Sequence, residues 1–201
     1  EDFLKTMAEA GWLGVVIPEE YGGAGLGITE ACLVLHEICA SGGGTTAASP
    51  VHFAFFPPMP VIKYGSEEQK RELLPKIAAG ELSLGFSITE PDAGTDTTRI
   101  STRAVRDGDD YLITGKKVWS SNLQRSGRTL LLARTTPYEQ CAKKTLGMSL
   151  FVLDLKSPGV TIREIDKLGR AAVDSNELFL DNVRVPAQDG ELRSAGSIPD
   201  P

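Results

Sequence analysis

The chain has 201 residues, of which 41% are hydrophobic and 24% are charged, a composition typical of a globular protein and not of a disordered chain. Its net charge is −6, which argues against nucleic acid as the main partner because neutralising phosphates requires clustered positive charge. No apolar run approaches the roughly 20 residues of a membrane-spanning helix, so no such span is predicted. Three cysteines and two histidines predict neither a disulfide framework nor a metal site, and they favour a reducing compartment.

The first residues, Glu1-Asp2-Phe3, include no initiator Met, and neither a basic nor a long apolar segment follows them. This pattern differs from that of a signal peptide and is typical of the interior of a helix. We therefore expect the chain to be a piece of a longer protein.

Residues 1–82 have the periodicity of helices. Apolar side chains recur at spacings of three and four, for example over residues 29–41. Ser66 and Gln69 form the pattern of a capping box, in which the two side chains satisfy backbone N–H groups at the start of a helix. Pro75 is predicted to break this helix, because proline has no N–H to donate.

Residues 83–187 change period. From Leu84 to Ile88 apolar residues alternate with small polar ones, and the later apolar runs are short and separated by turn residues. Helices followed by short strands predict an α+β fold, with an N-terminal helical domain and then an antiparallel β-barrel or sandwich. Residues 188–201 carry almost no large apolar side chain and are predicted to form an unstructured tail.

The densest polar stretch, residues 89–96, follows the first predicted strand. Backbone N–H groups near Gly94 and Thr95 can hold an anionic oxygen in a small nest, and the alternative is an ordinary β-turn. The stretch also contains three carboxylates, among them Glu90, which can be interpreted as an acid/base site. Clustered in one short loop, they are more typical of side chains that cap turns.

A second candidate segment, residues 118–122, lies at the end of a predicted strand and places Trp119 beside Ser120 and Ser121. An indole can pack on a planar ligand while a neighbouring hydroxyl bonds to the edge of that ligand. The alternative is a tryptophan that fills the core.

Taken in order, several segments resemble the acyl-CoA dehydrogenase family. They are GWLGVVIPEEYGG at residues 11–23, YGSEEQK at 64–70, FSITEPDAGTD at 86–96, GKKVW at 115–119 and NVRVP at 182–186. The resemblance extends from residue 1 to about 187. It implies an N-terminal α-domain clipped at its start, residues 1–82, and a middle β-barrel, residues 83–187. The family also has a C-terminal four-helix domain, for which no matching segment is present.

The resemblance further implies FAD as the cofactor. Thr89 is expected to bond to the pyrimidine edge of the flavin, and Trp119 to pack against it, with the hydroxyl of Ser121 near N5 and O4. Gly94 and Thr95 are expected to meet the pyrophosphate, and Thr95 also touches the substrate side. The full set of residues that the resemblance assigns to the cofactor is Phe86, Ile88, Thr89, Gly94, Thr95, Trp119, Ser120 and Ser121.

The activity that the resemblance implies is α,β-dehydrogenation of an acyl-CoA thioester, with an electron-transfer flavoprotein as acceptor. The family's catalytic Glu lies in the C-terminal domain, so no catalytic residue is assigned in this chain. We expect the isolated chain to be inactive and to bind FAD weakly. The parent is expected to be a homo-tetramer or homo-dimer in a bacterial cytoplasm or a mitochondrial matrix.

Three alternatives remain open at this point. The first is another flavoenzyme of the same fold, such as an acyl-CoA oxidase or a nitroalkane oxidase. The second is a binding or assembly module that keeps the fold without the chemistry. The third is a β-barrel carrier that binds acyl groups without flavin.

Overall fold

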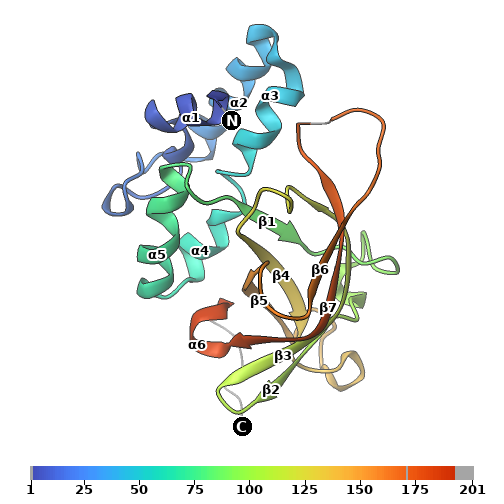
Figure 1. Ribbon diagram of the computed structural model, residues 1–201. Helices are drawn as coiled ribbons and strands as arrows, with labels where there is room; N and C mark the ends of the chain where they lie inside the picture. The colour runs from blue at the N-terminus through green and yellow to red at the C-terminus, as the bar shows by residue number, and fades with distance from the viewer. Residues whose placement is uncertain (1, 171, 193–201) are drawn as a thin grey trace.

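The computed structural model describes residues 2–170 and 172–192, which form a helical region on one side of the molecule and a β region on the other (Figure 1). The helices are α1 (Asp2–Glu9), α2 (Ile28–Ile38), α3 (Gly44–His52), α4 (Pro58–Tyr64), α5 (Glu67–Ala78) and the short α6 (Ala187–Gly190). The strands are β1 (Leu84–Ser87), β2 (Arg103–Asp107), β3 (Asp110–Ser121), β4 (Arg128–Arg134), β5 (Met148–Asp154), β6 (Val160–Glu164), β7 (Ser175–Pro186) and β8 (Glu191–Leu192).

Helix α5 shows one sequence prediction confirmed and one wrong. Ser66 Oγ accepts from the N–H of Gln69 over 3.2 Å, and the N–H of Ser66 donates to Gln69 Oε1 over 2.8 Å, so the capping box is present. The helix runs through Pro75 without a break. Its apolar face, including Leu74 and Ile77, is fully buried in the core, and this packing outweighs the hydrogen bond that the proline removes.

The strands form one sheet in the order β6-β7-β3-β1-β4-β5-β8, with β2 pairing with β3 and β4. Most pairs are antiparallel, but β1 and β4 run parallel from Leu84↔Arg128 to Ser87↔Leu131. The chain makes β2 and β3 between these two strands, which gives it the length that a parallel return requires. The predicted α+β class, helices followed by a mostly antiparallel sheet, is confirmed.

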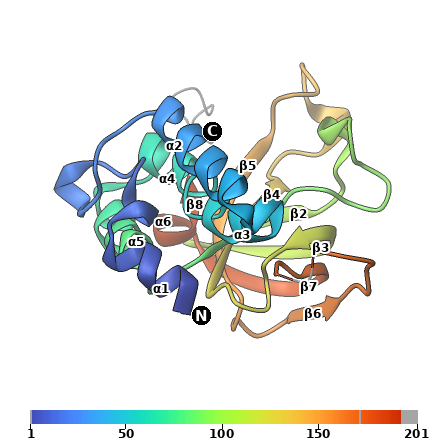
Figure 2. The ribbon, with the colours of Figure 1, turned by 90° about the horizontal axis from the view of Figure 1, so that it is seen from above.

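Two hydrophobic clusters meet at strand β4. Leu130 belongs to the cluster that packs the helices onto the sheet, together with Leu84 of β1. Leu131 belongs to the cluster inside the β region, together with Ile113 and Phe151. Successive side chains of a strand point to opposite faces, so adjacent residues of β4 serve different cores. Viewed from above, the helices accordingly gather against one side of the sheet (Figure 2).

The predicted unstructured tail is wrong for residues 188–192, which complete α6 and form β8. Strand β8 pairs with β5 through Leu150↔Leu192 and Phe151↔Glu191, and Leu192 is 5% exposed. The pairing uses backbone groups of β5, which a count of apolar side chains does not register. Residues 193–201 lie outside the described residues. Within the described ranges, no helix is long and apolar enough to cross a membrane.

Candidate functional site

Two segments distant in the sequence, β1 with its following loop and the end of β3, lie side by side. Phe86 pairs with Ser121, and the N–H of Val118 donates to the carbonyl of Thr89 over 2.9 Å. We call residues 86–89 and 118–121 the β1–β3 junction. Six of the eight residues assigned to the cofactor lie in it: Phe86, Ile88, Thr89, Trp119, Ser120 and Ser121.

Trp119 is presented to the outside by an irregularity in β3. The pairing of β3 with β7 shifts register between Lys117 and Ser120. Trp119 itself has φ = 60°, in the left-handed region that non-glycine residues rarely adopt. Such bulges redirect a side chain, and Trp119 is 61% exposed. The alternative that this tryptophan fills the core is therefore wrong.

The two serines that follow differ in their surroundings. Ser120 is 1% exposed, and its hydroxyl has no hydrogen-bond partner among the described residues. Its carbonyl accepts from Asn176 Nδ2 over 3.0 Å, which holds the strand on this side of the bulge. Ser121 is half-buried. The junction therefore combines an exposed indole with hydroxyl groups, one of which is buried and unpaired.

The loop over residues 89–96 contains both of the features that the sequence left open. Glu90 and Ala93 exchange backbone hydrogen bonds of 3.0 and 3.2 Å, which makes a tight turn. Beyond it, Gly94 is exposed, and a Cβ built on it meets no atom within 4 Å, so its backbone is open to a ligand. Thr95 is exposed beside it. These two residues are linked to the β1–β3 junction through the loop, and not through a direct contact given for the described residues.

A buried ion pair closes the base of this loop. Lys117 Nζ donates to Glu90 Oε1 over 2.8 Å, and the two side chains are 0% and 3% exposed. Glu90 Oε2 accepts from both the N–H and the Oγ of Ser101 over 2.7 Å. The N–H of Thr102 donates to Oε1 over 2.9 Å. The prediction that Glu90 caps a turn misses this partner, because the carboxylate is bonded mainly to segments outside its own loop.

A signal for this pair is present in the sequence of β3. Tyr111 and Ile113 alternate with more exposed residues, and Lys117 has the same parity as these two inward positions. A lysine at an inward position of a strand requires a buried carboxylate, because an unpaired ammonium is costly to bury. Glu90, in the adjacent polar loop, is that carboxylate.

The charge state of the pair follows from competing effects on the pKa of Glu90. Burial alone raises the pKa, but hydrogen bonds from Lys117 and Thr102 and the ammonium charge outweigh it and lower the pKa to about 2. Burial lowers the pKa of Lys117, and Glu90 opposes that shift. A carboxylate with so low a pKa is a poor proton acceptor near neutral pH. Glu90 is therefore suited to hold structure and not to act as a general base.

An aromatic column connects α3 to the junction. The ring of Phe86 lies 4.9 Å from that of Phe56 in an edge-to-face arrangement. Phe56 in turn stacks on His52 with centroids 4.5 Å apart. Burial and the charge of Arg170 lower the pKa of His52, so its ring is neutral at pH 7. The helical region thus contributes an apolar wall next to Phe86.

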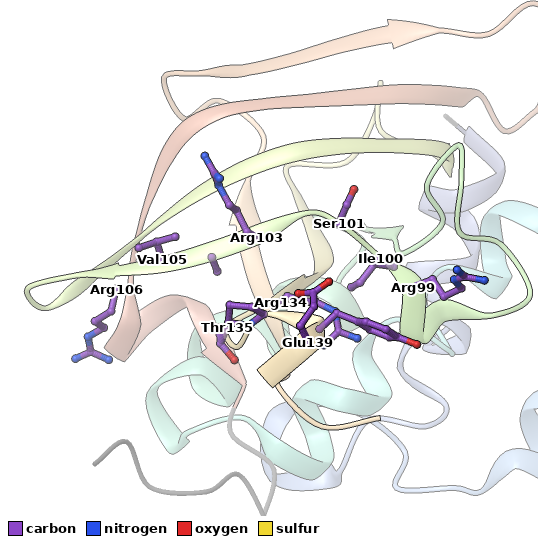
Figure 3. Close-up of a pocket in the computed structure, with 12 residues that line it drawn as sticks. Arg99, Ile100, Ser101, Arg103, Val105, Arg106, Arg134, Thr135 and Glu139 are labelled. Atoms are coloured by element: carbon purple, nitrogen blue, oxygen red, sulfur yellow. The ribbon is translucent and has the colours of Figure 1, made fainter. Parts of the chain in front are cut away.

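One pocket of the β region lies away from this junction. It has a volume of about 800 Å³ and lies between β2 and residues 134–139 (Figure 3). Arg103 and Arg106 on its rim point in different directions. The guanidinium of Arg134 is engaged by the carbonyls of Thr98, Lys144 and Leu146. This arrangement ties loops together and does not converge on a ligand.

A second pocket, of about 600 Å³, lies between the start of α5 and the β2–β3 turn. Neither pocket includes a residue of the β1–β3 junction. The junction is thus marked by an exposed wall and not by a cavity. Within the part of the chain that the structure describes, no group of three His, Cys, Asp or Glu side chains is placed to hold a metal ion.

Solved structures share this arrangement of a helical region and a mostly antiparallel sheet. An acyl-CoA dehydrogenase from Geobacillus kaustophilus superposes with a TM-score of 0.87 at 32% identity, over 96% of this chain and 50% of that one. The prolyl acyl carrier protein oxidase AnaB superposes with a TM-score of 0.82 at 27% identity, over 98% and 51% of the two chains. These likenesses define the two-region fold that this chain shares with acyl-CoA dehydrogenases.

Sequence comparison identifies the family. The model of the acyl-CoA dehydrogenase N-terminal domain matches residues 1–81, and that of the middle domain matches residues 85–183. The chain belongs to the acyl-CoA dehydrogenase family. Among curated relatives, the glutaryl-CoA dehydrogenase of Desulfococcus multivorans is 37% identical over 191 residues, 94% of this chain and 48% of its own length. The chain spans about half the length of the curated relatives that it matches.

Proposed function

We propose that this chain forms one wall of an FAD site in a flavin-dependent dehydrogenase of acyl-CoA thioesters. One observation carries the proposal: β1 and its following loop pair with the bulged end of β3, so the segment of Thr89 lies along the strand that exposes Trp119. Membership of the acyl-CoA dehydrogenase family supports the assignment. The substrate proposed is an acyl-CoA, and the acceptor an electron-transfer flavoprotein.

The residues present fit the cofactor. A flavin ring has flat apolar faces and a polar edge, so it requires an exposed aromatic surface and nearby hydrogen-bonding groups. Trp119 supplies the surface, and the hydroxyls of Ser120 and Ser121 supply polar groups, one of them buried and unpaired. The open backbone at Gly94 suits a pyrophosphate, which requires close approach to N–H groups.

Each residue has a defined task in this proposal. Trp119 packs against the ring, and Thr89 and Ser121 bond to its edge. Gly94 and Thr95 bind the pyrophosphate, and Thr95 also contacts the substrate. FAD, when bound, supplies the hydride-accepting chemistry that no side chain provides. The proton of the substrate is not assigned to a base in this chain, because the nearby buried carboxylate is ion-paired.

The proposal extends to the setting of the whole protein. Partners in a homo-tetramer or homo-dimer would complete the site, because the described wall is exposed on one side. The bacterial origin of the curated relatives favours a bacterial cytoplasm over a mitochondrial matrix. The mass of the native protein, measured by light scattering, tests the oligomer, and fractionation of the source cells tests the compartment.

Titration of the purified chain with FAD tests the central assignment. We expect weak binding, seen as quenching of flavin fluorescence, and a roughly fivefold or larger loss of affinity in W119A, since aromatic packing contributes on the order of 1 kcal/mol or more. W12F, which changes an exposed tryptophan of the helical region, is the matched control. Equal affinity of W119A and the wild type would contradict the assignment. Sustained reduction of an acceptor dye with acyl-CoA would show that the chain is complete for catalysis.

An oxidase of the same fold is the second candidate, favoured by the likeness to the oxidase AnaB. Peroxide formation by the native protein under air, in place of electron transfer to a flavoprotein, would select it. A carrier that encloses acyl groups inside the sheet is disfavoured, because Ile113, Phe151 and Leu178 fill that interior and are fully buried. A non-catalytic module remains distinguishable by its lack of turnover in the native protein.

A further inference from the structure

We propose that the buried Glu90–Lys117 pair is a positioning device that fixes both the bulge presenting Trp119 and the backbone of the loop at Thr89. The geometry of the pair comes from the described contacts alone. Its consequence for a ligand rests on the proposed function, that the β1–β3 junction is a flavin wall. Neither residue touches the ligand in this proposal, so both act through the residues that they hold.

The lysine end of the pair clamps the loop that follows β1. Lys117 Nζ donates to the carbonyl of Ile88 over 3.0 Å as well as to Glu90. The next residue, Val118, donates its N–H to the carbonyl of Thr89. Three consecutive residues of the loop, 88 to 90, are therefore held by two consecutive residues of β3. This registration fixes the backbone of Thr89 against that of Val118, the residue before Trp119.

The glutamate of the pair binds the other end of the segment that connects β1 to β2. Ser101 and Thr102, which directly precede β2, donate their backbone N–H groups to the carboxylate of Glu90. One carboxylate thus joins the start of the 88–102 connection to its end. The turn that carries Gly94 and Thr95 is closed at its base by this contact. The pair therefore organises both parts of the proposed site.

The bulge requires such an anchor. A non-glycine residue with positive φ is unfavourable and persists only where its surroundings hold it. Asn176 holds the strand after the bulge through the carbonyl of Ser120. Lys117 holds it before the bulge, at the last residue paired with β7 on that side. Removing this anchor leaves the backbone of Trp119 free to relax to an ordinary extended conformation.

A buried ion pair adds little net stability compared with neutral side chains of similar size. Its effect on the placement of Trp119 can therefore be measured apart from its effect on folding. Replacing both charges with neutral side chains of similar size is often neutral or stabilising, whereas removing one leaves the other charge buried alone. The double variant E90Q/K117M is therefore the informative change. We expect it to fold and to unfold within a few degrees of the wild type, yet to lose the placement of Trp119.

The experiment uses the W12F background, in which Trp119 is the remaining tryptophan. The near-ultraviolet circular dichroism of the indole, at about 290–295 nm, then reports the fixed surroundings of Trp119 without any cofactor. In E90Q/K117M we expect this band to fall to about half or less, and the Kd for FAD to rise roughly tenfold, the effect of about 1.4 kcal/mol. K116M is the matched control: Lys116 is the neighbouring lysine of β3, in a partly exposed pair with Glu177, and its loss should change neither reading.

The outcomes separate the two proposals. A folded double variant that keeps both the indole band and the affinity for FAD overturns the positioning role and leaves the flavin site standing. A wild type that binds no FAD, with a double variant that loses the indole band, refutes the proposed function and supports the positioning role. If the double variant does not fold, E90D decides, because it keeps both charges and shortens the side chain that joins Lys117 to Ser101 and Thr102. A partial loss of the band supports the proposal, and an unchanged band overturns it.

Discussion

At the scale of single residues, the carboxylate of Glu90 determines how the site responds to acid. Its four donors come from Ser101, Thr102 and Lys117, and together they keep it ionised far below the ordinary range of a glutamate. Trp119 depends on the same contacts, because its unfavourable φ is maintained by the residues on either side of it. One buried charge pair thus affects both the pH range of the fold and the placement of an exposed side chain.

The lowered pKa of Glu90 predicts a loss of stability in acid. The pKa is about 2 in the folded chain and 4.5 ordinarily, so the unfolded state binds the proton first as the pH falls. The contribution is complete above about pH 4.5 and is lost between there and about pH 2, and it amounts to the order of 3 kcal/mol. Urea unfolding of the wild type and of E90Q/K117M, at pH values from about 6 down to about 3, measures this contribution to the free energy of unfolding. The difference in the free energy of unfolding between the two proteins should change with pH. A constant difference would show that Glu90 does not titrate in this way.

At the scale of elements, α5 is fixed by its first turn and by its buried face. Ser66 and Gln69 satisfy the N–H groups at its start through contacts between residues three positions apart. The continuation past Pro75 depends instead on burial of Leu74 and Ile77 against the core. The first feature is predictable from a few neighbouring residues, and the second is not.

Replacing the capping serine tests the contribution of that first turn. S66A should lower the free energy of unfolding by about 1 kcal/mol, because the N–H of Gln69 loses its acceptor. S41A, which removes an exposed hydroxyl that bonds to the carbonyl of Ile38, serves as the control and should cost less. Chemical denaturation of the three proteins gives the comparison. Equal stability of S66A and wild type would show that water replaces the cap without loss.

At the scale of the whole molecule, the segment from α6 to β8 joins the sheet to the helices. Leu192 lies on the edge strand beside β5, yet its side chain packs in the cluster beneath the helices. Glu191 accepts from Ser149 over 2.7 Å at the same place. The end of the described chain is therefore part of the folded unit.

Truncation of Leu192 measures this contribution. L192A should destabilise the chain by about 2–4 kcal/mol, because it removes buried apolar surface and leaves a cavity. The matched control is L33A, the same change at an exposed position of α2, which should cost far less. Thermal and urea unfolding provide the values. A cost for L192A no larger than that for L33A would mean that β8 adds little to the core.

Local patterns in the sequence predict three features: the fold class, the order of the two regions and the motifs of the site. Examples of such patterns are the alternation from Leu84 to Ile88 and the polar loop at 89–96. The exposure of Trp119 was not, since its backbone conformation is imposed by the register of β3 against β7. The partner of Glu90 and the pairing of β8 also depend on residues far away in the sequence. Long-range contacts of this kind leave only weak signals in the sequence, such as the position of Lys117 on the inward-facing side of β3.

The placement of Leu130 and Leu131 on opposite faces of β4 has a mechanical consequence. Any disturbance of this strand reaches the helices and the interior of the sheet at once, because the same backbone supports both. The two regions should therefore melt together, as one calorimetric peak with matching calorimetric and van't Hoff enthalpies. The boundary between the two family domains is visible in the sequence, but we expect that it does not divide the molecule into independent folding units, and two separate calorimetric peaks would contradict this.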